Sequence, residues 1–120
     1  DVYKRQEFIR RDACDIMRTS THYKGGFTGG MKVGHVAEAF GMKAEVHGGG
    51  HNNLHLCLAL PNNTYYEDLV IDVEDIEAKG KGQLKFENGM YSFKEQVAGV
   101  GIEYDHDELE TISIQKYEKF

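Results

Sequence analysis

Residues 42–67 read MKAEVHGGGHNNLHLCLALPNNTYYE, in which a short apolar run leads to a histidine, three glycines, a leucine-rich segment and a glutamate. The run at 42–46 predicts a strand, and the segment at 52–60 predicts a helix that ends at the Pro61-Asn62 pair. Residues 64–70, TYYEDLV, predict a further strand. Because short connections join these strands through a helix, the stretch predicts parallel strands with crossover helices.

The preceding residues extend the same alternation. A polar, helix-like piece leads into a strand near residues 14–19, and a glycine-rich loop follows. From Thr28 apolar residues recur at helical spacing, with Thr28 as the expected N-cap and Gly41 as the C-terminal stop. The order strand, helix, strand, helix, strand predicts an α/β fold.

The last fifty residues have a different pattern. Residues 71–120 contain short alternating strands, one hairpin expected around Asn88-Gly89, and no long helix. We expect this β-rich tail to pack on a part of the protein that lies outside the chain.

The first six residues, DVYKRQ, are encoded by GATGTGTATAAGAGACAG, the end sequence of a transposase-based library adapter. We therefore interpret residues 1–6 as an artefact and expect the natural reading frame to continue upstream of Glu7. The alternative, in which DVYKRQ is genuine, stays open. The predicted organisation is an adapter at 1–6, strand–helix units at 7–70 and the tail at 71–120.

Composition narrows the range of partners. The 120 residues carry 20 acidic and 14 basic side chains, a net charge of -6, which argues against a nucleic-acid or anionic-membrane surface. No apolar run has the length of a membrane span and no signal peptide is recognisable, so we expect a cytoplasmic protein. Cys14 and Cys57 lie in apolar stretches without CxxC spacing, which favours buried free thiols.

Candidate site residues follow the predicted strands. In parallel α/β sheets the functional groups gather where strands end and helices begin, so Ser20, His22, His47 and Glu67 are expected to share one rim. Asp15 lies at the opposite end of its strand, roughly 15 Å away at ~3.3 Å per residue, and is a poor candidate. His47 has the basicity for general acid or base catalysis near neutrality.

Structural explanations compete with these functional ones. A lone histidine at a strand end is more often structural, and a glycine triplet is weak evidence for a ligand loop, here Gly48, Gly49 and Gly50. His51 and His55 are spaced four apart and, with His47, suggest a metal site, but the surrounding leucines favour a buried helix. The acidic run at 67–77 favours a solvated face, and Tyr65, Tyr66, Tyr91 and Phe93 favour core or tail packing.

A family resemblance rests on several motifs together. The segments KGGFTGGMKVGHVAEAFGMKAEVHGGG at 24–50 and LHLCLALPNNTYYE at 54–67 resemble the end of the barrel in the enolase superfamily, in the mandelate racemase and muconate lactonizing branch. GVGIEYDHDEL at 99–109 is similar to that branch's C-terminal strand, which returns to a capping domain. The resemblance covers roughly residues 12 to 110. It implies about the last three strands of a (β/α)7β TIM-like barrel, followed by the β-rich tail.

The resemblance also implies a chemistry. Such enzymes abstract the proton next to a substrate carboxylate and stabilise the enediolate with Mg²⁺, a superfamily that is itself the standard example of a Lys or His base working with magnesium. By position, His47 matches the barrel's acid or base histidine, and Glu67 matches a glutamate that binds the substrate carboxylate or enediolate. The metal-binding acids and the second acid/base residue are expected upstream of Glu7, so no metal ligand is assigned in this chain.

One position departs from the family pattern. Ser20 falls where an aspartate would pair with the histidine, and a hydroxyl cannot stabilise an imidazolium as a carboxylate does. His47 is therefore expected to act mainly as an acid toward a departing hydroxide, or His22 takes a share. A full-length sugar-acid dehydratase is the leading hypothesis. A racemase or epimerase of the same branch and a noncatalytic, decayed barrel that binds a ligand remain alternatives.

The expected partners follow from this hypothesis. The substrate would be a small hydroxy acid or sugar acid, and the parent enzyme would be a homo-oligomer. The isolated chain is expected to be inactive.

Overall fold

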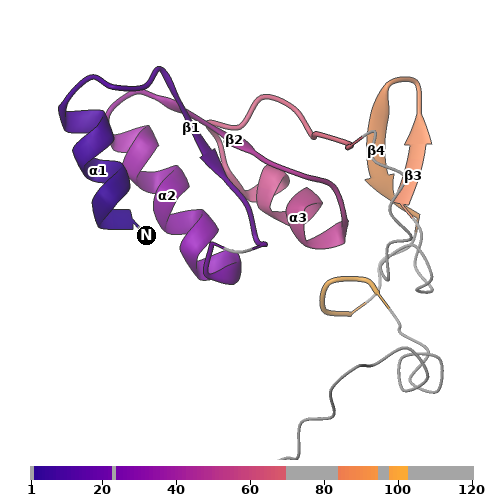
Figure 1. Cartoon of the computed structure of the whole chain (residues 1–120). Helices are drawn as coiled ribbons and strands as arrows, with labels where there is room; N and C mark the ends of the chain where they lie inside the picture. Colours follow the sequence, from indigo (N-terminus) through magenta and orange to yellow (C-terminus); the bar gives the residue numbers. More distant parts are fainter. Residues whose placement is uncertain (1, 23, 70–83, 95–97, 103–120) are drawn as a thin grey trace, which may run out of the picture. The chain divides into compact units, whose positions relative to one another are not determined.

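The computed structural model describes residues 2–22, 24–69, 84–94 and 98–102 (Figure 1). The chain divides into two compact units, Asp1–Asp72 and Val73–Phe120. The first unit carries all candidate site residues.

Helices and strands alternate in the first unit, as the sequence predicts. Its two strands are parallel neighbours, with Met17 opposite Ala44 and Thr19 opposite Val46. The elements in order are α1 (Val2–Arg10), β1 (Ile16–Thr19), α2 (Gly26–Ala39), β2 (Lys43–Val46) and α3 (His51–Ala59). The α/β class is therefore confirmed. Helix α1 includes most of the residues that we interpret as adapter-encoded, and its formation does not bear on that interpretation.

The core lies between the strand pair and the helices. Helix α2 contacts both strands, and α3 contacts β2 and α2 (Figure 1). One cluster, around Met17, Val33 and Ala44, joins α2 to both strands; a second, around Val46 and Leu56, joins β2 to α3. Successive strand residues point to opposite faces of the sheet, so the residues between these core positions point away from the helices.

Close packing of α2 on α3 depends on two glycines. A Cβ at Gly30 would lie 2.7 Å from Cδ2 of Leu56, and a Cβ at Gly34 would lie 2.2 Å from Cδ2 of Leu60. Both separations are far below van der Waals contact. Leu56 of α3 and Leu60, the residue after α3, therefore pack directly on the backbone of α2.

The start of α2 differs from the expectation and its end agrees with it. The N-cap is Gly25, not Thr28; Gly25 has φ 83° and its carbonyl accepts the Gly29 amide at 3.0 Å, so the helix begins before Thr28 and needs no side-chain cap. At the other end the Gly41 amide donates to Glu38 and the Met42 amide donates to Ala37. This is a Schellman motif with Gly41, at φ 69°, in the left-handed position, as predicted.

The predicted strand at 64–70 is not formed over 64–69, and residue 70 lies outside the described residues. The free edge of β2 is occupied by other groups. The Ala44 amide donates to the Asn62 carbonyl, the Val46 amide to Asn63 Oδ1, and the Gly48 amide to Glu67 Oε2. Because two of these acceptors are side chains, no backbone ladder runs along residues 64–69.

The described part of the second unit contains the predicted hairpin. Strands β3 (Leu84–Glu87) and β4 (Met90–Phe93) pair antiparallel, and Asn88 and Gly89 connect them with φ values of 52° and 77°. Two positive φ values are typical of a type I′ turn, which Asn-Gly favours. Most of the acidic run at 67–77 and of the segment at 99–109 lies outside the described residues.

The cysteines and tyrosines agree in part with the environments that the sequence predicts. Both cysteines are free; Cys57 is buried, and burial raises the pKa of its thiol to about 11, whereas Cys14 is only half-buried. Tyr66 packs on the second core cluster, but Tyr65 is 54% exposed and is not a core residue. None of the described helices is long and apolar enough to cross a membrane.

Candidate active site

His47 comes directly after β2, at the end of the strand where the α/β pattern places functional groups. Its amide donates to the Thr19 carbonyl at 2.7 Å, which continues the pairing with β1 and fixes the backbone of His47. The side chain is 56% exposed. The imidazole is thus presented at the rim by two paired strands.

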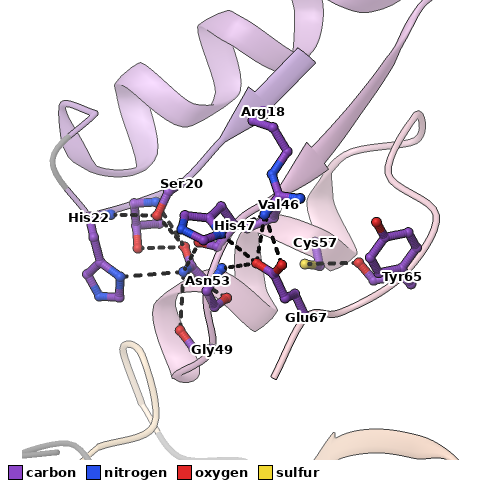
Figure 2. A network of polar contacts seen from close by, with 12 residues as sticks. Arg18, Ser20, His22, Val46, His47, Gly49, Asn53, Cys57, Tyr65 and Glu67 are labelled. Carbon is purple, nitrogen blue, oxygen red and sulfur yellow. Dashed lines mark hydrogen bonds and ion pairs between the residues drawn. The ribbon is translucent and has the colours of Figure 1, made fainter. Parts of the chain in front are cut away.

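Glu67 lies beside His47, although the two are twenty positions apart. Oε2 of Glu67 is 2.7 Å from Nδ1 of His47 and accepts the Gly48 amide at 2.7 Å (Figure 2). The Glu67 side chain is 24% exposed. The structure therefore brings together the two residues that the sequence singles out as catalytic.

Arg18 is the third member of this cluster and is not among the residues predicted from the sequence. Its Nη2 donates to Glu67 at 2.9 Å (Oε1) and 2.8 Å (Oε2) and lies 2.6 Å from Nδ1 of His47 (Figure 2). Met17 and Thr19 face the helices, so period-2 alternation places Arg18 on the opposite face. That alternation is the signal that could have found it.

Neighbouring groups stabilise the negative charge of Glu67. The backbone amide of Gly48, and after it the guanidinium of Arg18, lower the pKa of Glu67 to about 2. Both partners stabilise the carboxylate relative to the carboxylic acid. Glu67 is accordingly an anion throughout the neutral range.

Ser20 and His22 belong to a neighbouring network, not to this cluster. Ser20 is buried; its hydroxyl donates to Asn53 Oδ1 at 3.4 Å and accepts the His22 amide at 3.1 Å. Nδ1 of His22 is 3.5 Å from Asn53 Nδ2. Within the described residues, neither side chain hydrogen-bonds to His47.

Asn53 links the two loops that carry the candidates. This α3 residue is fully buried; Oδ1 accepts the amide and the hydroxyl of Thr21, each at 2.9 Å. Its Nδ2 lies 2.9 Å from the His47 carbonyl, 3.0 Å from that of Gly48 and 3.1 Å from that of Gly49. A single amide group therefore holds the loop after β1 and the loop after β2 together (Figure 2).

The glycine triplet is used inside the molecule. Gly48 and Gly50 have φ values of 87° and 90°, and the Gly50 amide donates to the Tyr66 hydroxyl at 2.7 Å. A Cβ at Gly49 would lie 3.2 Å from that hydroxyl. The close approach that these glycines permit is thus, in this structure, that of the segment carrying Glu67.

Glu45 anchors the same segment. It lies opposite Arg18 in the strand register, is buried, and accepts the Thr64 amide at 3.0 Å and the Thr64 hydroxyl at 2.5 Å. These bonds fix the chain shortly before Glu67. Glu45 therefore helps to place Glu67 at the rim.

The chemistry available to this cluster is proton transfer. In the described part of the chain Nε2 of His47 has no hydrogen-bond partner, whereas Nδ1 faces Arg18 and Glu67. An exposed imidazole nitrogen beside a carboxylate is the arrangement of a general acid or base. No group of three His, Cys, Asp or Glu that could hold a metal occurs among the described residues, which include His47, His51 and His55.

A family model described as "Enolase C-terminal domain-like" matches residues 1–108. No curated protein matches the sequence.

Solved structures with the same fold include magnesium-containing enzymes. D-glucarate dehydratase from Agrobacterium tumefaciens, complexed with magnesium, is 30% identical over 91% of this chain and 30% of its own, with a TM-score of 0.74. A racemase from Streptomyces coelicolor with bound magnesium is 21% identical over 94% of this chain and 30% of its own, with a TM-score of 0.78. A putative L-alanine-DL-glutamate epimerase from Burkholderia xenovorans, bound to magnesium and fumarate, is 17% identical over 92% of this chain and 28% of its own, with a TM-score of 0.75. The chain thus spans about 30% of the length of the first two structures and 28% of the third.

Proposed function

Because the chain belongs to the enolase C-terminal domain-like family, we propose that it is the C-terminal barrel part of a longer enzyme that dehydrates a sugar acid. In this proposal β1, α2, β2 and α3 are strand–helix units of a (β/α)7β barrel, and the active site lies at the rim that carries His47. The substrate is a small hydroxy acid with a carboxylate, a hydrogen and a hydroxyl group on the α-carbon, and a β-hydroxyl group.

The observation that carries the proposal is the cluster itself. His47 presents an unpartnered Nε2 within the described residues, beside an ionised Glu67, at the end of a parallel strand. The 30% identity to a D-glucarate dehydratase over 91% of the chain supports dehydration over the other reactions of the fold.

The reaction removes one water from the substrate. A base outside this chain takes the α-proton, and the electron pair of that C–H bond forms a carbon–carbon double bond as the β-hydroxyl leaves. We assign to Nε2 of His47 the proton that this hydroxyl takes with it as water. The enol that results tautomerises to a 2-keto-3-deoxy acid, so atoms and charge balance.

Magnesium is the cofactor of this proposal. When bound, it would neutralise the substrate carboxylate and the negative charge that develops beside it. The described residues do not contain a ligand set for it, so the metal would be held by residues outside them, and we derive no step from it.

Glu67 and Arg18 are proposed to bind and orient. Glu67 matches the family's substrate-binding glutamate by position, and Arg18 offers a cation at the same rim for an acidic substrate. The glycines at 48–50 place the backbone of this rim close to Glu67. Ser20 and His22 are kept as supporting residues of the neighbouring loop.

The test begins with the DNA upstream of the Glu7 codon. A continuing frame with carboxylates at the ends of three successive strands supports the enzyme, and a start codon immediately upstream overturns it. The complete protein is then incubated with Mg²⁺ and a panel of sugar acids, and 2-keto acid formation is measured. The expected result is turnover by the wild type and a loss of at least ~10²-fold in His47→Asn.

Two alternatives are outcomes of the same experiment. Solvent deuterium that enters the α-position without keto-acid formation indicates a racemase or epimerase. Ligand binding without either reaction, and a frame that lacks the upstream carboxylates, indicates a decayed barrel. A homo-oligomer is expected for the complete protein, and its mass in solution tests this.

A further inference from the structure

Nδ1 of His47 faces two partners that demand opposite protonation states. It lies 2.6 Å from Nη2 of Arg18 and 2.7 Å from Oε2 of Glu67. A guanidinium only donates hydrogen bonds and a carboxylate only accepts them. A neutral imidazole with its proton on Nδ1 can bond to Glu67, and one with its proton on Nε2 can bond to Arg18, but neither form satisfies both contacts.

The hydrogens on Nη2 of Arg18 decide between the two forms. This nitrogen carries two hydrogens, and its bonds to Oε1 and Oε2 of Glu67 use both, so none is left to donate to Nδ1. Glu67 is also tied to the Gly48 backbone amide, next to His47 in the chain, at 2.7 Å. The contact between Arg18 and His47 is therefore not a hydrogen bond.

We infer that Glu67 is the carboxylate partner of His47: it accepts the Nδ1 proton and leaves Nε2 as the nitrogen that exchanges protons with the ligand. Glu67 then positions His47 through the imidazole, in addition to the substrate-binding role proposed above. Arg18 anchors this carboxylate from the other side.

The inference explains how the site works without an acidic residue at position 20. The Ser20 hydroxyl is bonded to Asn53 and carries no charge, so it cannot stabilise an imidazolium. Glu67 supplies that negative charge from the segment after α3, because its carboxylate lies at hydrogen-bond distance from the ring. The inference rests on the proposed function for the task of His47, but the tautomer itself can be observed without turnover.

The test measures directly which ring nitrogen of His47 carries the proton. The complete protein is labelled with ¹⁵N-histidine, and its spectrum is recorded at rising pH until the ring signals of His47 no longer change, which shows that the ring is neutral. The His47 signals are assigned from the spectrum of His47→Gln. The expected wild-type result is a protonated Nδ1 and an unprotonated Nε2.

Three variants test which neighbouring side chain determines the position of the proton on His47. In Glu67→Ala the proton should move to Nε2, because the remaining partner of Nδ1 is a donor. In Arg18→Met the proton should stay on Nδ1. Glu38→Ala removes an exposed carboxylate of α2 and should change nothing.

A wild-type proton on Nε2 overturns the inference, and so does a switch in Arg18→Met with none in Glu67→Ala. If Glu67→Ala does not fold, the wild-type and Arg18→Met spectra still show which ring nitrogen carries the proton and whether Arg18 determines its position. A protonated Nδ1 in a protein that turns over no sugar acid rejects the proposed function alone. Turnover with a protonated Nε2 rejects this inference alone.

Discussion

At the residue scale, the carboxylate of Glu67 binds several groups of the candidate site at once. Glu67 receives a backbone amide, a guanidinium and an imidazole within 2.9 Å. Hydrogen bonds to charged groups are stronger than neutral ones, so this carboxylate organises the rim. Its two side-chain neighbours, Arg18 and His47, come from β1 and from the residue after β2.

The first prediction concerns pH. The folded-state pKa of Glu67, about 2, lies below the ordinary 4.5, so its contribution to the free energy of unfolding is full above about pH 4.5 and is lost as pH falls toward 2. In the complete protein, the difference in Tm between wild type and Glu67→Gln should therefore shrink over this range. A difference that stays constant between pH 5 and pH 2 would contradict the assignment.

The second prediction concerns Ser20. Its hydroxyl contacts Asn53 and the loop, so Ser20→Ala should leave the pH dependence of turnover in the complete enzyme unchanged, even if the rate falls. Ser20→Asp is the matched variant, because it introduces a carboxylate at the position. A shifted pH profile in Ser20→Ala would return Ser20 to the proton transfer.

At the element scale, α3 positions the site through one buried side chain. Asn53→Ala would leave three loop carbonyls without this donor and the Thr21 amide without its acceptor. Each buried polar group left unpaired costs about 1–3 kcal/mol, so a clear fall in Tm is expected in the complete protein.

Asn52→Ala is the control for this variant. The neighbouring Asn52 has a buried Oδ1 without a hydrogen-bond partner in the described residues, so its removal should cost much less. Equal losses of Tm in the two variants would argue against the special role of Asn53.

The packing of α2 on α3 gives a further prediction. Gly34→Ala would place a Cβ 2.2 Å from Leu60, and such overpacking costs about 1–3 kcal/mol, measured as a fall in Tm. Thr28→Ala, on the exposed face of the same helix, should be almost neutral, because the N-cap is Gly25. A loss of about 1 kcal/mol in Thr28→Ala would instead indicate a capping role.

At the scale of the whole molecule, the strand pair of β1 and β2 is too small to enclose a hydrophobic core. The described residues of the first unit form one sheet of two strands, with Ile16 49% exposed and Arg18 exposed on the face away from the helices. The barrel proposed above would take about 250 residues. In that proposal the remaining strands cover this face and the free edge of β1.

The last prediction follows from this geometry. The isolated chain of 120 residues should be inactive and should aggregate or remain loosely folded, because no described element of the first unit covers the exposed face and edge. Thermal unfolding and analytical ultracentrifugation test this. A sharp thermal transition in a monomer would overturn the prediction.

The sequence by itself determined the alternation of helices and strands, the stop of α2 at Gly41 and the Asn88-Gly89 hairpin. These features are local: apolar periodicity, a left-handed glycine and a two-residue turn act over a few neighbouring residues. It also singled out His47, which follows a segment with a strand-like pattern, and Glu67, which lies within one; the family resemblance supplied their expected roles.

Only the tertiary structure decided how those residues meet. Arg18 reaches Glu67 across 49 positions and Asn53 reaches Thr21 across 32, and no local pattern records such pairings. The strand expected at 64–70 is not formed over 64–69 for the same reason: the side chains of Asn63 and Glu67 accept the amides of Val46 in β2 and of Gly48 beyond it, which a backbone ladder would use. Local propensity predicts which segments can form a strand, but competition for hydrogen bonds in the folded chain decides which segments do.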